Sequence, residues 1–220
     1  MQRRLVRRID LEMALSEVRP HPRPDPKLEQ YTIPPETAVD LLFFAAYTND
    51  DIIGRRVLDL GCGTGRLAIG AALLGAEEVL GVDVDAVAVR VGLEDAAKLG
   101  VDDVVSWVVG DIGVVIGGFD TVVQNPPFGV QRSKADRRFL QKALEVGRVV
   151  YSLHKAGVSN RRFIRRFVEL HGGKITHIIP LRMWIPWMFT FHSKRRYMVE
   201  VDLYRIVGGR RREREEGKRW

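Results

Sequence analysis

A glycine-rich segment follows a short apolar run and precedes a helical pattern, which is the arrangement of a nucleotide-type ligand site. The segment reads Asp59-Leu60-Gly61-Cys62-Gly63-Thr64-Gly65. Its glycines let the backbone approach a ligand closely, and the carboxyl edge of a parallel sheet supplies the crevice. The fingerprint for a hydride cofactor would need a third glycine where the chain has Arg66. A pyrophosphate site is therefore disfavoured.

Two acidic residues follow later apolar runs at the same predicted edge. Asp83 lies about twenty residues beyond the loop, where an acid commonly accepts hydrogen bonds from ribose hydroxyls. Asp111 follows the next run and is placed to meet an adenine ring. Because the loop lacks the Lys-Ser/Thr pair of a phosphate site, the set favours S-adenosylmethionine, which carries a sulfonium and no phosphate. The alternatives are a packing turn for the loop and a helix cap for Asp111.

A third element at this edge is Asn125-Pro126-Pro127-Phe128. The exocyclic amine of a base is a poor nucleophile, because its lone pair is delocalised into the ring. The side-chain oxygen of Asn125 and the carbonyl of Pro126 could accept both amine hydrogens and so favour a tetrahedral nitrogen. Prolines hold such carbonyls rigidly, and Phe128 offers a stacking face for an extruded base. Taken alone, the tetrapeptide could equally be a rigid turn with an apolar plug.

The elements that position these residues follow from the apolar pattern. From Arg56 onward, β-branched runs alternate with helical patterns, which predicts a parallel sheet with helices on both faces. We expect strands at 57–60, 79–82, 104–109, 121–123 and 149–153. We expect helices that end near 74 and that cover 85–99, 135–148 and 159–171. Late strands at 174–181 and 197–206 should form an antiparallel pair that closes the sheet.

The chain divides into three predicted parts. Residues 1–34 hold an N-terminal helix over 3–18 and a proline-rich linker, which must be extended and stiff. Residues 35–207 form the main α/β domain, which begins with a helix from Pro35 to Tyr47. Residues 208–220 are glycine-led and highly charged, and we expect them to be disordered.

The composition fits a folded domain with an acidic partner. Of the 220 residues, 45% are hydrophobic and 29% are charged, which is enough to bury a core. The net charge of +7 suggests nucleic acid first, with an arginine-rich thermostable surface as the alternative. A single cysteine, Cys62, and scattered histidines predict neither a disulfide nor a metal site. Without a spanning stretch or a signal-peptide core, we expect a cytoplasmic protein.

The chain resembles the methyltransferase-like family that makes N6-methyladenosine at one site of small-subunit ribosomal RNA. The landmarks are Glu29-Gln30-Tyr31, Asp59 to Gly63, Asn125 to Gly129, Tyr151 to Lys155, Phe191 to Lys194 and Glu200 to Leu203. The resemblance covers about residues 3–207 and is that of an archaeal-type member. It implies a class I, seven-stranded Rossmann-like methyltransferase fold, mostly parallel with an antiparallel last strand. The chain departs from the family at Thr32-Ile33, where Pro-Thr is usual, and at Thr64, which is often cysteine.

The resemblance also implies roles for particular residues. The target base would be held by Asn125 to Phe128, that is, by Asn125, Pro126, Pro127 and Phe128. The cofactor S-adenosyl-L-methionine would be bound by Gln30, Thr32, Asp59, Gly61, Gly63, Thr64, Arg66, Asp83, Asp111, Ile112 and Asn125. The family further implies a small zinc-ribbon activator protein that covers hydrophobic surface on the enzyme.

Contacts to RNA are predicted from charge and place. Arg132 and Lys134 directly follow the Asn-Pro-Pro-Phe motif, where an RNA backbone must pass. His154 and Lys155 end a strand at the same edge, and Phe128 completes the predicted substrate contacts. Four arginines also lie on one side of the helix expected at 159–171, for which a solvated outer face is the favoured interpretation.

The sequence therefore predicts an S-adenosylmethionine-dependent methyltransferase that acts on N6 of an adenine in small-subunit rRNA. Guanine-N2 rRNA methyltransferases use the same Asn-Pro-Pro-Phe motif and remain an alternative. Glutamine-N5 protein methyltransferases usually carry tyrosine after the prolines, where this chain has Phe128. A catalytically silent RNA-binding assembly subunit is the alternative from another functional class.

Overall fold

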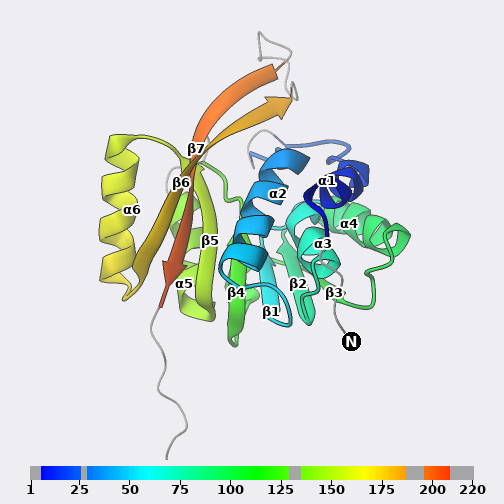
Figure 1. Ribbon diagram of the computed structural model, residues 1–220, viewed down its shortest axis with the longest axis horizontal. Helices are drawn as coiled ribbons and strands as arrows, with labels where there is room; N and C mark the ends of the chain where they lie inside the picture. Colours follow the sequence, from blue (N-terminus) through cyan, green and yellow to red (C-terminus); the bar gives the residue numbers. More distant parts are fainter. Residues whose placement is uncertain (1–5, 26–28, 129–134, 187–195, 209–220) are drawn as a thin grey trace, which may run out of the picture.

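A seven-stranded sheet forms the centre of the protein (Figure 1). The computed structural model describes residues 6–25, 29–128, 135–186 and 196–208, and of 185–186 and 196–197 it describes the backbone alone. The predicted RNA contacts Arg132 and Lys134 lie outside the described residues, as does most of the charged tail. Within this described part, no helix is long and apolar enough to cross a membrane.

The sheet combines parallel and antiparallel strands as predicted. Its order is β3-β2-β1-β4-β5-β7-β6. Strands β1 to β5 run parallel, and β7 is antiparallel to both of its neighbours. The bounds are β1 (Arg56–Leu60), β2 (Glu78–Asp83), β3 (Val105–Val109), β4 (Phe119–Gln124), β5 (Gly147–Lys155), β6 (Lys174–Pro186) and β7 (Arg196–Val207). The prediction of a mostly parallel Rossmann-like sheet that an antiparallel strand closes is confirmed.

Helices cover both faces of the sheet, because apolar side chains point to both sides of its central strands (Figure 1). α1 to α4 pack on one face, and α5 and α6 pack on the other. The bounds are α1 (Arg8–Glu17), α2 (Pro35–Phe43), α3 (Arg66–Leu73), α4 (Ala86–Lys98), α5 (Ala135–Val146) and α6 (Val158–Leu170). A π-helical turn, η2 (Phe44–Thr48), extends α2, and a 3₁₀ turn, η3 (Ile112–Val114), follows β3.

The N-terminal helix is part of the main core. Leu11 and Leu15 of α1 are fully buried against α2 and α3. α1 begins later than the helix expected over 3–18, because the backbone at Arg7 is extended and the N–H of Val6 donates to the Tyr47 hydroxyl. The division of the chain into three parts stays a prediction.

The last two strands are longer than the sequence pattern indicates. The last pair between β5 and β7 is Lys155 with Val201, whereas β6 and β7 remain paired as far as Pro186 and Arg196. Residues 182–186 and 196–200 therefore form a two-stranded arm beyond the carboxyl edge of the sheet (Figure 1). In this arm, β6 and β7 pair only with each other among the described strands.

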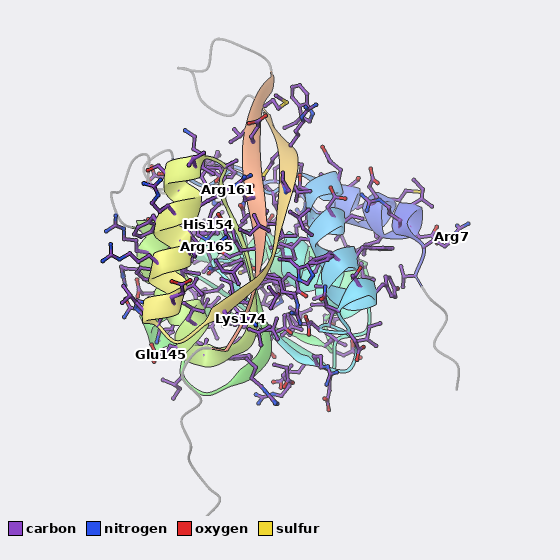
Figure 2. All side chains as sticks on the ribbon, turned by 60° about the vertical axis from the view of Figure 1, so that its left-hand side comes forward. Arg7, Glu145, His154, Arg161, Arg165 and Lys174 are labelled. Atoms are coloured by element: carbon purple, nitrogen blue, oxygen red, sulfur yellow. The ribbon has the colours of Figure 1, made fainter. Side chains whose placement is uncertain are left out.

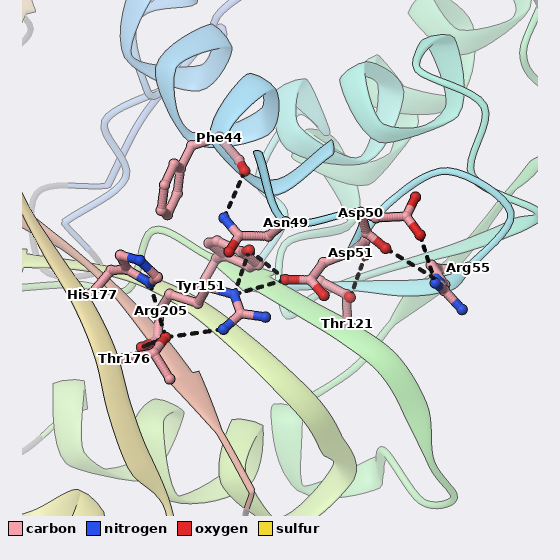
Figure 3. Close-up of polar contacts among 10 residues, drawn as sticks. All are labelled: Phe44, Asn49, Asp50, Asp51, Arg55, Thr121, Tyr151, Thr176, His177 and Arg205. Carbon is pink, nitrogen blue, oxygen red and sulfur yellow. Dashed lines mark hydrogen bonds and ion pairs between the residues drawn. The ribbon is translucent and has the colours of Figure 1, made fainter. Parts of the chain in front are cut away.

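A polar cluster ties the segment after η2 to the sheet (Figure 3). The Asp51 carboxylate accepts hydrogen bonds from the Tyr151 hydroxyl at 2.5 Å and from Nε of Arg205 at 2.8 Å. The Thr121 hydroxyl donates to the backbone carbonyl of Asp51. Because β4, β5 and β7 each supply one of these partners, the cluster fixes the segment that follows α2 and η2 over the strands.

Candidate active site

A cavity of about 820 Å³ opens at the carboxyl edge of the sheet. Its walls come from the segments that follow β1, β2, β3 and β4, together with the linker, defined as residues 18–25 and 29–34. Every residue predicted to bind the cofactor lines this cavity: Gln30, Thr32, Asp59, Gly61, Gly63, Thr64, Arg66, Asp83, Asp111, Ile112 and Asn125. The volume falls in the range of a small-molecule site.

The loop after β1 takes its shape from glycines in a backbone conformation that other residues rarely adopt. Gly61, Gly63 and Gly65 have φ of +75°, +54° and +81°. A Cβ at Gly65 would lie 2.1 Å from the Trp107 ring of β3. The loop backbone therefore lies close to the sheet and leaves the space above it to a ligand.

Asp83 ties the loop to the end of β2. Its carboxylate accepts hydrogen bonds from the backbone N–H of Gly63 at 2.8 Å and of Asp85 at 2.9 Å. Burial raises the pKa of Asp83, and these two hydrogen bonds oppose that rise by stabilising the charged form. An oriented carboxylate at this position can accept hydrogen bonds from a ribose.

Asp59 is a buried carboxyl with one unused oxygen. Its Oδ2 accepts from the backbone N–H of Ala68 at 2.9 Å, while Oδ1 has no partner among the described residues. Burial raises the pKa of Asp59 to about 8. The Thr64 hydroxyl is likewise buried and unpartnered in the described part of the chain. Both polar groups line the cavity, so a bound ligand with polar atoms at this end would satisfy them.

The linker closes one side of the cavity, and Arg66 holds it there. The guanidinium of Arg66 donates to the backbone carbonyls of Val18, at 2.5 Å, and Ile33. Gln30 adds a second attachment, because its Nε2 donates to the Asp85 carboxylate at 2.8 Å. Arg66 thus holds the linker in the cavity wall in addition to facing the ligand space. Burial lowers its pKa to about 10, so the guanidinium stays charged at pH 7.

The Asn-Pro-Pro-Phe motif leaves β4 at the rim of the cavity. Asn125 and Pro127 line the cavity, whereas Pro126 is buried behind them. The side-chain Oδ1 of Asn125 is buried and accepts no hydrogen bond from the described residues. Phe128 packs against Tyr31 of the linker, with ring centroids 5.4 Å apart. The motif therefore presents an unused acceptor beside an aromatic wall.

His154 lies beneath the motif and not at its surface. It is 3% exposed, and its Nε2 is 2.7 Å from the hydroxyl of Ser152, which accepts from Nε2 of Gln124 at 2.9 Å. Burial lowers the pKa of His154 to about 4, so the ring is neutral at pH 7. The next residue, Lys155, is exposed at the end of β5. Of this predicted pair, only Lys155 is at the surface.

The structure adds residues to the site that sequence reasoning did not assign. Tyr31 lines the cavity, and its hydroxyl is buried without a partner in the described residues. It belongs to the Glu29-Gln30-Tyr31 landmark, but no role was predicted for it. Phe139 and Arg138 of α5 also line the cavity, and Arg138 pairs with Asp111 at 3.0 Å. No local pattern marks these two, because only the fold places α5 beside the loop. Among the described residues, no group of three metal-ligating side chains gathers.

Comparison with known proteins divides the chain at the motif. The family model for ribosomal protein L11 methyltransferase (PrmA) matches residues 37–126. These residues include the glycine loop, both acids and the start of the motif, but leave out the linker and the last two strands. The match therefore covers less than half of the chain, namely the part that supplies most of the predicted cofactor-binding residues.

Other relatives match nearly the whole chain. The rRNA N(6)-adenosine-methyltransferase METTL5 of Danio rerio is 38% identical over 90% of this chain and 97% of its own length. The Drosophila melanogaster Mettl5 is 36% identical over 90% of this chain and 95% of its own. Among solved structures, a candidate RNA methyltransferase from Pyrococcus horikoshii is 42% identical, with a TM-score of 0.86, and covers 94% of this chain and 100% of that one.

Proposed function

This chain belongs to the METTL5 family of rRNA N(6)-adenosine-methyltransferases, and from that premise we propose that it methylates N6 of one adenine in small-subunit rRNA. S-adenosyl-L-methionine is the methyl donor in this proposal. The single observation that carries it is the buried Oδ1 of Asn125 in the wall of the cavity, which has no partner among the described residues. An amine hydrogen is the donor that this acceptor lacks.

The cavity suits the proposed cofactor. The unused oxygens of Asp59 and Thr64 lie at the glycine-loop end, and the oriented carboxylate of Asp83 lies between that end and Asp111. Polar groups of the methionine portion, the ribose and the adenine would meet these residues in that order. When bound, S-adenosylmethionine supplies an electrophilic methyl group on its sulfonium.

The residues of the motif would activate the target amine. By accepting hydrogen bonds, Oδ1 of Asn125 and the carbonyl of Pro126 would localise the lone pair on nitrogen. The nitrogen activated in this way would accept the methyl group that the bound cofactor supplies. The nitrogen then loses its extra proton to water, so no strong general base is required. Phe128 and Tyr31 would hold the extruded base between the motif and the linker.

The other functions fit the chain less well. The match to the L11 methyltransferase model ends at Pro126, before the segments that would select a substrate. Phe128 stands where glutamine-N5 methyltransferases usually carry tyrosine. The assembly subunit has no need of an open cavity with unused acceptors. Guanine-N2 transfer would use the same acceptors, so the identity of the product separates it from adenine-N6 transfer.

We propose that the zinc-ribbon activator docks at the β3 edge of the sheet. β3 is the outermost described strand on that side, so its outer backbone groups pair with no other described strand and could pair with another chain. Val109 of β3 is 53% exposed, and Val87 of α4, the helix that packs against β3, is 51% exposed. A partner that covers apolar surface fits this edge. We also propose that the complex acts in the cytoplasm.

The test is methyl transfer from labelled S-adenosylmethionine to deproteinised small-subunit and large-subunit rRNA, with nucleoside mass spectrometry of the product. We expect N6-methyladenosine in the small-subunit rRNA alone. N2-methylguanosine would keep the fold and cofactor but overturn the substrate. If no transfer occurs with or without a zinc-ribbon partner, methylation of RNA by this chain is ruled out.

A further inference from the structure

Most arginines of the described chain that lie outside α6 face a carboxylate. The ion pairs join Arg7 to Asp10, Arg8 to Asp40, Arg19 to Glu94, Arg55 to Asp50, Arg56 to Glu78, Arg138 to Asp111, Arg148 to Asp120 and Arg205 to Asp51. Networks and pairs of this kind are what an arginine-rich thermostable surface would contain. These ion pairs account for many of the arginines without any need for a bound anion.

The arginines of α6 break this pattern. Arg161 alone has an acidic partner, because its guanidinium binds both oxygens of the buried Asp202 at 2.7 Å. Arg162, Arg165 and Arg166 are exposed and form no ion pair with any described residue. Arg165 and Arg166 stand three and four positions after Arg162, and like charges at this spacing on a helix are neighbours and repel. We call these three residues the arginine face of α6; Figure 2 labels one of them, Arg165, on this helix.

The order of charges along α6 is also opposite to the one that stabilises a helix. Positive charge is favourable at the C-terminal end and unfavourable at the N-terminal end. In α6, Arg161 and Arg162 lie within the first five residues, the last turn has no basic residue, and Glu169 is near its end. Helix stability therefore does not account for the arginine face, whereas a bound polyanion would relieve both forms of repulsion.

The helix that carries the arginine face begins at the same carboxyl edge of the sheet at which the cavity opens. α6 begins shortly after β5 ends at the exposed Lys155, and β5 lies next to β4, from which the Asn-Pro-Pro-Phe motif leaves. Both segments are thus at the carboxyl edge of adjacent strands. Arg182, on the arm above this edge, is exposed and has no ion-pair partner among the described residues either.

We propose that the arginine face of α6 binds the phosphate backbone of the RNA whose adenine enters the cavity. This inference rests on the proposed function and adds a docking surface to it. The RNA would run from the motif over Lys155 and along α6, so three phosphates would be neutralised at a distance from the reacting amine. The pairing pattern thus changes the interpretation of this helix from a solvated outer face to an RNA-binding surface.

The test compares two triple variants that remove the same charge. One is Arg162→Gln/Arg165→Gln/Arg166→Gln. The matched control is Arg7→Gln/Arg55→Gln/Arg148→Gln, which neutralises exposed arginines that are already paired.

Binding of a small-subunit rRNA fragment is measured against salt. For the α6 variant, we expect the slope of log affinity against log salt to fall by about 2–3, from about 0.7–0.9 for each phosphate. KM for RNA should rise at least tenfold, while kcat at saturating RNA and the affinity for S-adenosylmethionine stay unchanged. Restoring the charge with lysine at the three positions should restore most of the slope.

Equal changes in the two variants would overturn the inference, because net charge alone would then explain them; so would an α6 variant that binds as the wild type does. Failure of the proposed function looks different. The wild-type enzyme would then form no N6-methyladenosine, whatever the salt dependence of its RNA binding.

Discussion

The raised pKa of Asp59 predicts that cofactor binding depends on pH and releases a proton. Burial raises this pKa to about 8, so at pH 7 about nine-tenths of the carboxyl groups are protonated. A ligand that places its ammonium at the unused Oδ1 needs the ionised form. Removing the proton costs about 1.4 kcal/mol at pH 7, or about tenfold in affinity. Between pH 6 and pH 7, the affinity for S-adenosylmethionine should therefore rise about tenfold.

The direction follows from the sign of the shift. Because the pKa of Asp59 is raised in the free enzyme, the protonated form dominates below pH 8 and the penalty grows as the pH falls. Calorimetry at pH 7 in two buffers of different ionisation enthalpy should show the release of about 0.9 proton for each cofactor bound. The control is Asp59→Asn, which keeps an acceptor for the N–H of Ala68. An equal pH dependence in the control, or proton uptake by the wild type, would refute the reasoning.

Two further substitutions test the cavity wall and the packing beneath the loop. Tyr31→Phe removes a buried hydroxyl that has no partner in the described part of the chain, so the free energy of unfolding should rise by up to about 1 kcal/mol in denaturant titrations while methyl transfer falls. A loss of stability would show that the hydroxyl is paired. In Gly92→Ala, the new Cβ would lie 2.8 Å from the Trp107 ring and 3.0 Å from the carbonyl of Thr64. We expect the free energy of unfolding to fall by about 1–3 kcal/mol and the affinity for the cofactor to fall as well. Gly118→Ala, which has open space around it, should leave both unchanged, and similar losses in the two variants would contradict the packing argument.

Most of the fold and much of the cavity could be predicted because local signals agree with the topology. The β-branched runs define the parallel strands, and parallel strands bring their carboxyl ends to one edge. Asp59, Asp83, Asp111 and Asn125 each come at the end of a predicted strand or just after it, so sequence order alone was enough to bring them together.

The remaining features depend on contacts between segments far apart in the sequence. Arg66 holds the linker through carbonyls 33 and 48 residues away, and backbone carbonyls leave no sequence signal. His154 ends an apolar strand pattern, but only the β4–β5 register shows that it is bonded under the motif. The same reason hides Phe139 from sequence reasoning, because α5 meets the glycine loop only in three dimensions.

The most direct test of the central claim is the effect of Asn125→Ala on transfer and on cofactor binding, measured side by side. If Oδ1 of Asn125 is the acceptor for the target amine, kcat for N6-methyladenosine formation should fall by about 10²–10³. The dissociation constant of S-adenosylmethionine should change less than threefold, because the other cofactor-facing residues remain. An equal loss of transfer and cofactor affinity, or transfer that survives the substitution, would contradict the assigned role.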